Sequence, residues 1–284
     1  GITEVSEADL NKLAFWNATG SGKTFLMHIN IKQYQYYAKK HNIDIDNILL
    51  ITPNEDMTAQ HKKELDESDI YADVFDPNGN YGFFGQKSVI VIDICKFGEK
   101  EGVKKVAIDS FTGQNLVLVD EGHRGQSGTS WINYRDKLAK NGFAFEYSAT
   151  FGQAIGALSA TAQRKVLAAY GKCTLFDYSY KYFYEAGYGK DYRIMNMQNW
   201  PNPSALEEYL TAYLLMFYEQ KLVFSSDTTI HKNFLIENPL ALFVGAKVSA
   251  TSADNTVIID GHNIQVSDVV FVLLFLQKFT DYTN

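Results

Sequence analysis

The chain has 284 residues, of which 46% are hydrophobic and 21% are charged. At about 150 residues per domain, this length predicts one large or two modest domains. The composition excludes a disordered or collagen-like chain. Basic residues number 26 and acidic residues 33, which gives a formal net charge of −7. Any role in nucleic-acid binding must therefore rest on a local groove rather than on the whole surface.

The cysteines and the apolar runs indicate the cellular compartment of the protein. Cys95 and Cys173 are the only cysteines and form no CxxC pair or Cys/His cluster. This excludes a disulfide framework, argues against a structural zinc site and favours a reducing compartment. The longest apolar run, residues 269–276, is much shorter than the roughly 20 residues of a membrane helix. We therefore expect a cytoplasmic protein that has no membrane partner.

The first half of the chain alternates apolar strands with helical segments. A strand at 13–16 leads into a glycine-rich turn at 17–24 and a helix at 24–40. Further strands are expected at residues 47–52, 71–75, 88–94, 116–119 and 144–147, with a polar helix after the first of them. Runs that are apolar throughout indicate a sheet covered on both faces. The pattern up to about residue 150 thus predicts an α/β fold with a mainly parallel sheet.

After Thr150 the pattern changes. The expected elements are a helix at 151–169, a Tyr-rich segment at 177–192, an extended connector at 200–203, a helix at 204–222, a buried strand at 240–245 and a helix at 267–279. Ser204 as N-cap and Glu207 three residues later predict a capping box at the start of the second of these helices. We expect three parts: residues 1–198 as an ATP-binding domain with a Tyr-rich extension, 199–238 as a helical connector and 239–284 as part of a second domain.

Tyrosines at every second position stand out in the Tyr-rich segment. Tyr178, Tyr180, Tyr182 and Tyr184 follow the period of one strand face. Packing against a sheet or a role in an inter-domain connector is favoured over stacking on single-stranded bases, which aromatic side chains can also do.

Residues 17–24 match a Walker A phosphate loop. The match holds at every fixed position except the first, where Asn17 replaces glycine. Backbone N–H groups freed by the glycines converge on phosphates, the lysine reaches the β and γ phosphates, and the last hydroxyl binds Mg²⁺. The alternative is a glycine-rich turn with an incidental lysine. The expected ATP-binding residues are Thr19, Gly20, Ser21, Gly22, Lys23 and Thr24.

Two adjacent acids end the expected strand at 116–119. An acid at the carboxyl end of a parallel strand faces the ligand crevice of an α/β sheet. Asp120 could hold Mg²⁺ through water, and Glu121 could orient or deprotonate the attacking water. We therefore expect Lys23, Asp120 and Glu121 to be catalytic, with Thr24 and Asp120 as the magnesium ligands. The alternative is a surface turn with two solvated acids.

Three segments together resemble a known family. Residues 18–24, 120–123 and 148–150 are similar to motifs I, II and III of superfamily-two helicases of the DExH subgroup. Two further segments resemble the motif Ia region: Ile51-Thr52-Pro53-Asn54 and the following Gln60-His61. The His-Arg-Gly continuation at 123–125 and Phe145-Glu146-Tyr147 resemble the motor (R) subunit of type III restriction enzymes.

The resemblance implies an ATP-binding, RecA-like P-loop NTPase domain that couples ATP hydrolysis, with Mg²⁺, to movement on nucleic acid. Double-stranded DNA would be the substrate, and a modification or specificity subunit would be a partner. His123 would sense the nucleotide state. Ser148 and Thr150 would couple hydrolysis to strand movement. Thr52, Pro53 and Asn54 would lie along the nucleic-acid groove.

The positions of the arginines bear on whether the ATP site of this chain is complete. Members of the family finish the ATP site with arginines of a second RecA-like domain, and no arginine follows Arg193 in this chain. We therefore expect a fragment, truncated at both ends, that contains only the start of a second RecA-like domain and hydrolyses ATP weakly alone. The alternatives are a P-loop NTPase or kinase that does not act on nucleic acid, and a non-catalytic nucleotide-binding fragment.

Overall fold

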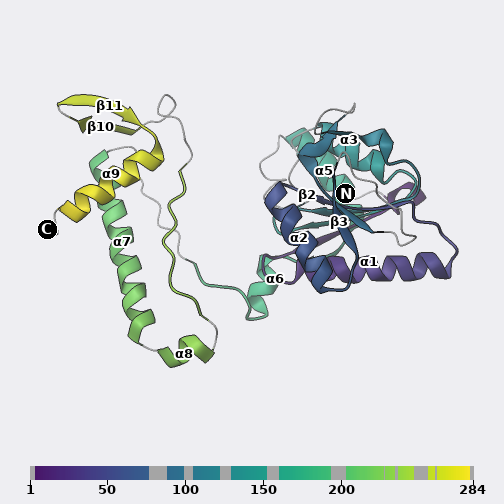
Figure 1. Cartoon of the computed structure of the whole chain (residues 1–284), viewed down its shortest axis with the longest axis horizontal. Coiled ribbons are helices and arrows are strands. Elements are labelled where there is room, and N and C mark those ends of the chain that lie inside the picture. The colour runs from purple at the N-terminus through teal and green to yellow at the C-terminus, as the bar shows by residue number, and fades with distance from the viewer. Residues whose placement is uncertain are drawn as a thin grey trace. The chain divides into compact units, whose positions relative to one another are not determined.

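The computed structural model describes residues 4–76, 88–98, 105–121, 129–151, 160–192, 203–226, 228–233, 236–245, 255–259 and 261–281. The chain divides into two compact units, Gly1–Asp191 and Tyr192–Asn284. Figure 1 shows the elements of both units, and each unit has hydrophobic clustering of its own. None of the helices described combines the length and the apolarity that crossing a bilayer requires.

A parallel sheet forms the centre of the first unit. Within the described residues it has seven strands, in the spatial order β3 (Ala72–Val74), β4 (Val89–Asp93), β2 (Asn47–Thr52), β7 (Asn115–Asp120), β8 (Phe143–Ser148), β1 (Lys12–Asn17) and β9 (Thr174–Tyr178). Every neighbouring pair is parallel. The carboxyl ends of these strands therefore meet at one edge of the sheet. The expected α/β fold with a mainly parallel sheet is confirmed.

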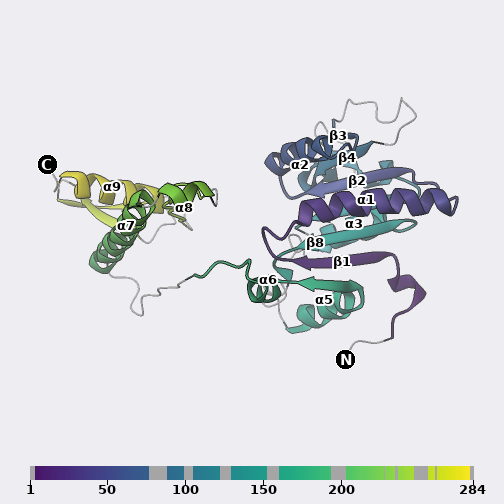
Figure 2. The same cartoon turned by 90° about the horizontal axis from the view of Figure 1, so that it is seen from below.

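Helices cover both faces of this sheet. Two of them, α1 (Lys23–Lys40) and α2 (Glu55–Glu67), lie on one face, while α3 (Thr129–Leu138) and α5 (Ala160–Cys173) lie on the other (Figures 1 and 2). Short elements complete the unit: η1 (Glu7–Asp9), η2 (Ile94–Lys96), β5 (Phe97–Gly98), β6 (Val106–Ala107), η3 (Ile108–Ser110) and α6 (Tyr180–Glu185).

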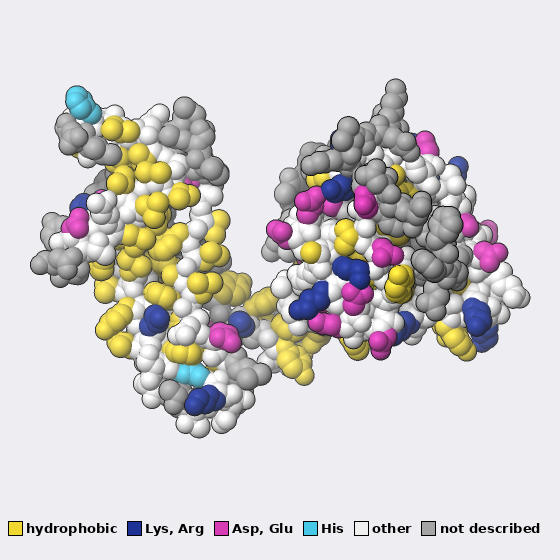
Figure 3. Space-filling model, in the orientation of Figure 1, with side chains coloured by type: hydrophobic (Ala, Val, Ile, Leu, Met, Phe, Trp, Pro, Cys, Tyr) yellow, Lys and Arg dark blue, Asp and Glu magenta, His cyan; other side chains and the backbone are white. Residues whose placement is uncertain are grey.

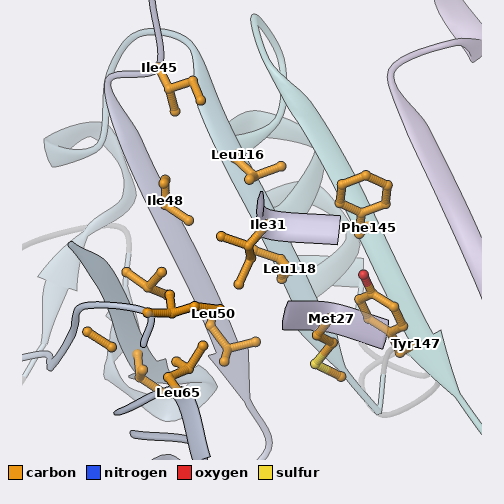
Figure 4. Close-up of a cluster of buried hydrophobic side chains, with 14 of the residues drawn as sticks. Met27, Ile31, Ile45, Ile48, Leu50, Leu65, Leu116, Leu118, Phe145 and Tyr147 are labelled. Atoms are coloured by element: carbon orange, nitrogen blue, oxygen red, sulfur yellow. The ribbon is translucent and has the colours of Figure 1, made fainter. Parts of the chain in front are cut away.

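The central strands are buried on both sides, as their continuous apolar runs predict. Leu50 and Leu118 face Met27 and Ile31 of α1, whereas the alternate residues of the same strands belong to the cluster on the α3 face (Figure 4). Full burial of a side chain of this size contributes about 1.5–3 kcal/mol. The middle of the sheet is therefore tightly packed, and it supports the residues that follow the carboxyl ends of its strands.

The Tyr-rich segment differs from the expected strand. Strand β9 ends at Tyr178, and α6 begins after Ser179, which has the extended backbone of an N-cap. Tyr180 and Tyr184 are therefore one helical turn apart, with ring centroids 6.1 Å apart, and both are more than 40% exposed. The expectation of one tyrosine face on a strand is wrong, because a local helix start overrides the period of two.

The second unit consists of helices and a hairpin. Its elements are α7 (Pro203–Ser226), α8 (Thr228–Asn233), β10 (Asn255–Ile259), β11 (His262–Val266) and α9 (Asp268–Asp281). Leu210 of α7 packs with Val266, Phe271 and Phe275. The helices expected at 204–222 and 267–279 are confirmed, whereas the hairpin was not expected. Helix α7 begins at Pro203, so Ser204 lies inside it and the expected cap at Ser204 is wrong.

Residues 236–245 are described without regular secondary structure, so the strand expected at 240–245 is wrong. Leu240, Leu242 and Val244 are 83%, 70% and 84% exposed, and hydrophobic side chains gather on this face of the unit (Figure 3). Phe243 is the residue that packs, against Tyr213 of α7. A short apolar run does not define a strand unless another strand pairs with its backbone.

Candidate nucleotide-binding site

The glycine-rich loop joins β1 to the first turn of α1. Gly20 and Gly22 have φ angles of +81° and +88°, a left-handed backbone that favours glycine. A Cβ atom at either position would meet no other atom within 4 Å. The backbone conformation, rather than a lack of space for a side chain, is therefore what requires glycine at both positions.

Backbone hydrogen bonds hold this loop in shape. Ala18 N–H donates to the carbonyl of Tyr178 at 2.8 Å, and Ser21 N–H donates to that of Ala18 at 3.1 Å. The side-chain oxygens of Asn17 and Ser21 are buried without a hydrogen-bond partner. Buried polar atoms without partners are rare in folded proteins and indicate a missing partner such as a ligand or water.

An ion pair brings the loop to the acids at the end of β7. Lys23 Nζ lies 2.7 Å from Glu121 Oε1, and the side chains are 13% and 20% exposed. The two residues are 98 positions apart. Glu121 has a φ angle of +52°, so the chain turns sharply after the strand. Lys23 and Glu121, both expected to be catalytic, thus lie together at the edge where β7 ends.

Asp120 is held by two donors. Its Oδ1 accepts from the backbone N–H of Glu121 at 2.9 Å, and its Oδ2 lies 3.0 Å from Nε2 of His61 on α2. Asp120 is 7% exposed and His61 is 3% exposed. The sequence offered no signal for this contact, because the two residues are 59 positions apart and His61 belongs to no metal-ligand spacing.

The segment 148–150 lies beside the loop, because β8 pairs with β1 and places Ser148 opposite Trp16. Ser148 Oγ accepts from Thr150 N–H at 3.0 Å. Trp16 Nε1 donates to the carbonyl of Ala149 at 3.1 Å. Thr150 Oγ1 is buried without a partner. This short turn is therefore fixed directly to the strand that carries the phosphate loop.

The residues at 52–54 lie where β2 ends at the same edge. Thr52 is 1% exposed, and its hydroxyl lies 2.6 Å from that of Thr58. Asn54 is exposed and caps α2 by accepting from Met57 N–H at 2.9 Å. Of the three expected nucleic-acid contacts, Pro53 and Asn54 have accessible side chains, while Thr52 supports the turn from inside.

A buried charge network lies behind the 148–150 turn. Arg135 Nη1 of α3 lies 2.9 Å from Glu146 Oε1 of β8, and the Tyr170 hydroxyl of α5 donates to the other Glu146 oxygen. Burial has the largest single effect on the pKa of Arg135 and lowers it, but Glu146, Tyr170 and Asp136 together raise that pKa by more, so it stays above its ordinary value. The network joins two helices to the strand that carries Ser148.

The side chains available here are of the kind that Mg²⁺ prefers. The described residues include no group of three or more His, Cys, Asp or Glu that could hold a metal ion by themselves. A threonine hydroxyl and a carboxylate nevertheless suit a magnesium ion that takes its other ligands from phosphates and water. Thr24 lies at the start of α1, beside Lys23. His123, expected to sense the nucleotide, lies outside the described residues.

Solved structures of an ATPase core and of two helicases are similar to this chain. The Sulfolobus solfataricus SWI2/SNF2 ATPase core in complex with dsDNA is 11% identical, with a TM-score of 0.40 over 58% of this chain and 39% of that one. The UvsW helicase from bacteriophage T4 is 17% identical, with a TM-score of 0.38 over 55% of this chain and 51% of that one. The Pyrococcus furiosus Hef helicase domain is 15% identical, with a TM-score of 0.37 over 58% of this chain and 34% of that one. The chain thus spans about half or less of their lengths. No curated protein matches it.

A family model covers more than half of the chain. The model for the res subunit of type III restriction enzymes matches residues 2–153, the part that contains the phosphate loop, the two acids and the 148–150 turn. The resemblance drawn from these motifs is confirmed. The chain belongs to the family of type III restriction enzyme res subunits.

Proposed function

We propose that the chain is the ATP-binding part of a motor that couples ATP hydrolysis to movement along nucleic acid, with double-stranded DNA as the substrate. The observation that carries the proposal is the ion pair between Lys23 and Glu121. It joins the phosphate loop to the acid expected to act on water, across 98 residues. The proposal includes a type III restriction setting with a modification or specificity subunit as partner, and the family match supports it.

In this proposal each residue at the carboxyl edge of the parallel sheet has its own functional role. Backbone N–H groups of Thr19 to Gly22 bind phosphates, and Lys23 leaves Glu121 to contact the β and γ phosphates. Thr24 and Asp120 would hold Mg²⁺, which offsets the negative charge of the phosphates. Glu121 then orients water. The resemblance assigns coupling to His123, Ser148 and Thr150, and the nucleic-acid groove to residues 52–54.

Nucleotide binding is tested by calorimetry with ADP and with ATP in the presence of Mg²⁺. Lys23→Ala removes a charge-assisted contact to phosphate, so affinity should fall by tenfold or more, taking about 1.5–3 kcal/mol for such a contact. Lys39→Ala is the matched control, because Lys39 is an exposed lysine on the same helix and should change nothing. An equal affinity of Lys23→Ala and the unsubstituted chain would refute the proposal.

Binding to nucleic acid separates this proposal from a kinase or another P-loop enzyme. Anisotropy of a labelled double-stranded oligonucleotide should show binding that weakens steeply as salt rises, because neutralised phosphates release counterions. A chain that binds nucleotide but no oligonucleotide at low salt would be a P-loop protein of another kind. Residues 239–284 as the start of a second RecA-like domain, and weak hydrolysis by the chain alone, remain predictions.

A further inference from the structure

His61 is a buried histidine whose contact lies inside the nucleotide site. Its Nε2 is 3.0 Å from Oδ2 of Asp120, and the two side chains are 4% and 6% exposed. An ionised carboxylate can only accept hydrogen bonds, so Nε2 is the nitrogen that donates. The other ring nitrogen, Nδ1, is buried without a hydrogen-bond partner. This nitrogen lies 3.9 Å from Oε2 of Glu64, beyond hydrogen-bond distance, so the hydrogen bond of the imidazole goes to Asp120.

The contact fixes how the Asp120 carboxylate is turned. One oxygen accepts from the backbone N–H of Glu121 and the other from His61, so the group is held from both sides. Each carboxylate oxygen has two lone pairs, and one donor on each leaves acceptor capacity for a cation. Carboxylates that bind metals are commonly oriented by such donors, which raise metal affinity without touching the metal.

Helix α2 delivers His61 to this position by packing on the sheet. Three of its residues are buried, at a spacing that places them on one helix face: Thr58, His61 and Leu65. Leu65 enters the main hydrophobic cluster, and Thr58 is hydrogen-bonded to Thr52 at the end of β2. Since β2 pairs directly with β7, the middle residue of this face reaches the carboxyl end of β7.

We propose that His61 is a positioning residue that holds Asp120 in the orientation needed for the divalent cation of a bound nucleotide. The inference rests on the proposed function. It assigns His61 to the nucleotide site. His61 would act there by orienting Asp120 and not by contacting the nucleotide.

The test separates metal-dependent from metal-independent binding. A fluorescent ADP analogue is titrated into the unsubstituted chain, His61→Leu and His61→Gln, in excess EDTA and then over a Mg²⁺ series. His61→Leu removes the donor, and the apparent Mg²⁺ affinity should fall about 10- to 100-fold, as for other partners of metal ligands. Affinity in EDTA should stay the same. His61→Gln keeps an N–H donor of similar reach and should restore most of the Mg²⁺ response.

His28→Leu is the matched control. His28 is a second buried histidine, but its Nδ1 contacts Ser68 rather than Asp120, so its loss should leave the Mg²⁺ series unchanged. Thermal unfolding shows whether each variant is folded. If His61→Leu does not fold, His61→Asn takes its place, because the shorter amide stays polar but does not reach Asp120.

The outcomes are distinct. If His61→Leu responds to Mg²⁺ like the unsubstituted chain, or loses affinity equally with and without Mg²⁺, the positioning role is refuted while the proposed function stands. If the unsubstituted chain binds no nucleotide in either condition, the proposed function fails and this inference fails with it. A loss confined to the Mg²⁺ series and restored by His61→Gln supports the role.

Discussion

At the scale of single residues, the buried pair of Arg135 and Glu146 is more sensitive to substitution than the exposed ion pairs. The two residues are 4% and 0% exposed, and Glu146 also accepts from Tyr170. Exposed ion pairs, such as that between Lys63 and Glu67, contribute about 0–1 kcal/mol. Removing one partner of a buried pair instead leaves an uncompensated charge in the interior.

Arg135→Leu should therefore lower the free energy of unfolding by about 3–5 kcal/mol. Urea unfolding followed by circular dichroism measures this value. Arg164→Leu on α5 is the control, because Arg164 is exposed and its loss should change stability by no more than about 0.5 kcal/mol. Similar midpoints for the two variants would show that Glu146 is compensated by other groups.

At the scale of elements, α2 links two parts of the edge. Its N-terminus is capped by Asn54, whose side chain accepts from Met57 N–H, and its buried face carries His61 to Asp120. The position of the helix therefore affects both the 52–54 turn and the end of β7. Capping of the helix by Asn54 can be separated from a contact of Asn54 with nucleic acid, because a cap needs only an oxygen acceptor.

Asn54→Ala should destabilise the protein by about 1 kcal/mol, whereas Asn54→Asp should retain the cap. The thermal unfolding midpoint checks both changes. If residues 52–54 line the nucleic-acid groove, Asn54→Asp should also weaken oligonucleotide binding, since it adds a negative charge beside phosphates. Unchanged oligonucleotide affinity in Asn54→Asp would remove Asn54 from the groove.

Helix α1 contributes a pH dependence through His28. Burial lowers the pKa of His28 below 6.5; His61 and Lys32 lower it further and Glu64 opposes them. The unfolded state then takes up the proton at a higher pH than the folded state does. The contribution to stability is complete above pH 6.5 and is lost as the pH falls through the lowered pKa. Urea unfolding of the unsubstituted chain should show this decline.

His28→Gln is the variant that isolates the effect. Its free energy of unfolding should depend less on pH than that of the unsubstituted chain in the range below pH 6.5, because the group that titrates is gone. Parallel curves for the two proteins over this range would assign the decline to other groups.

At the scale of the whole molecule, the chain consists of two units with separate cores. The first, Gly1–Asp191, contains the sheet and all described residues of the candidate site. The second is built around Leu210, Val266, Phe271 and Phe275 and exposes many apolar side chains over α7 and residues 236–245. Large exposed apolar patches are uncommon on monomeric proteins.

A chain that ends at Asp191 should therefore fold by itself. Because the clusters beneath the site lie within the first unit, this shorter chain should unfold in one cooperative transition and bind ADP with the affinity of the full chain. Differential scanning calorimetry and ADP titration are the measurements. A broad transition or lost ADP binding would show that the site depends on residues after Asp191.

The sequence by itself determined the α/β class, the alternation of parallel strands and helices up to about residue 150 and the position of Asp120 and Glu121 at the carboxyl end of a strand. Continuous apolar runs and the glycine-rich loop are local signals, and parallel strands collect their carboxyl ends at one edge whatever their exact register. In the second half such signals misled at 240–245 and across the tyrosines from 178 to 184, because a neighbouring strand or a local helix start decides those conformations.

Only the tertiary structure decided which side chains support the site. The contact of His61 with Asp120, the network of Arg135, Glu146 and Tyr170 and the bond from Trp16 to Ala149 join residues 11 to 133 positions apart. Such contacts correspond to no motif or regular residue spacing that could be recognised in the sequence. They depend on how helices pack on the sheet, which is set by the sum of many small burial energies rather than by any short motif.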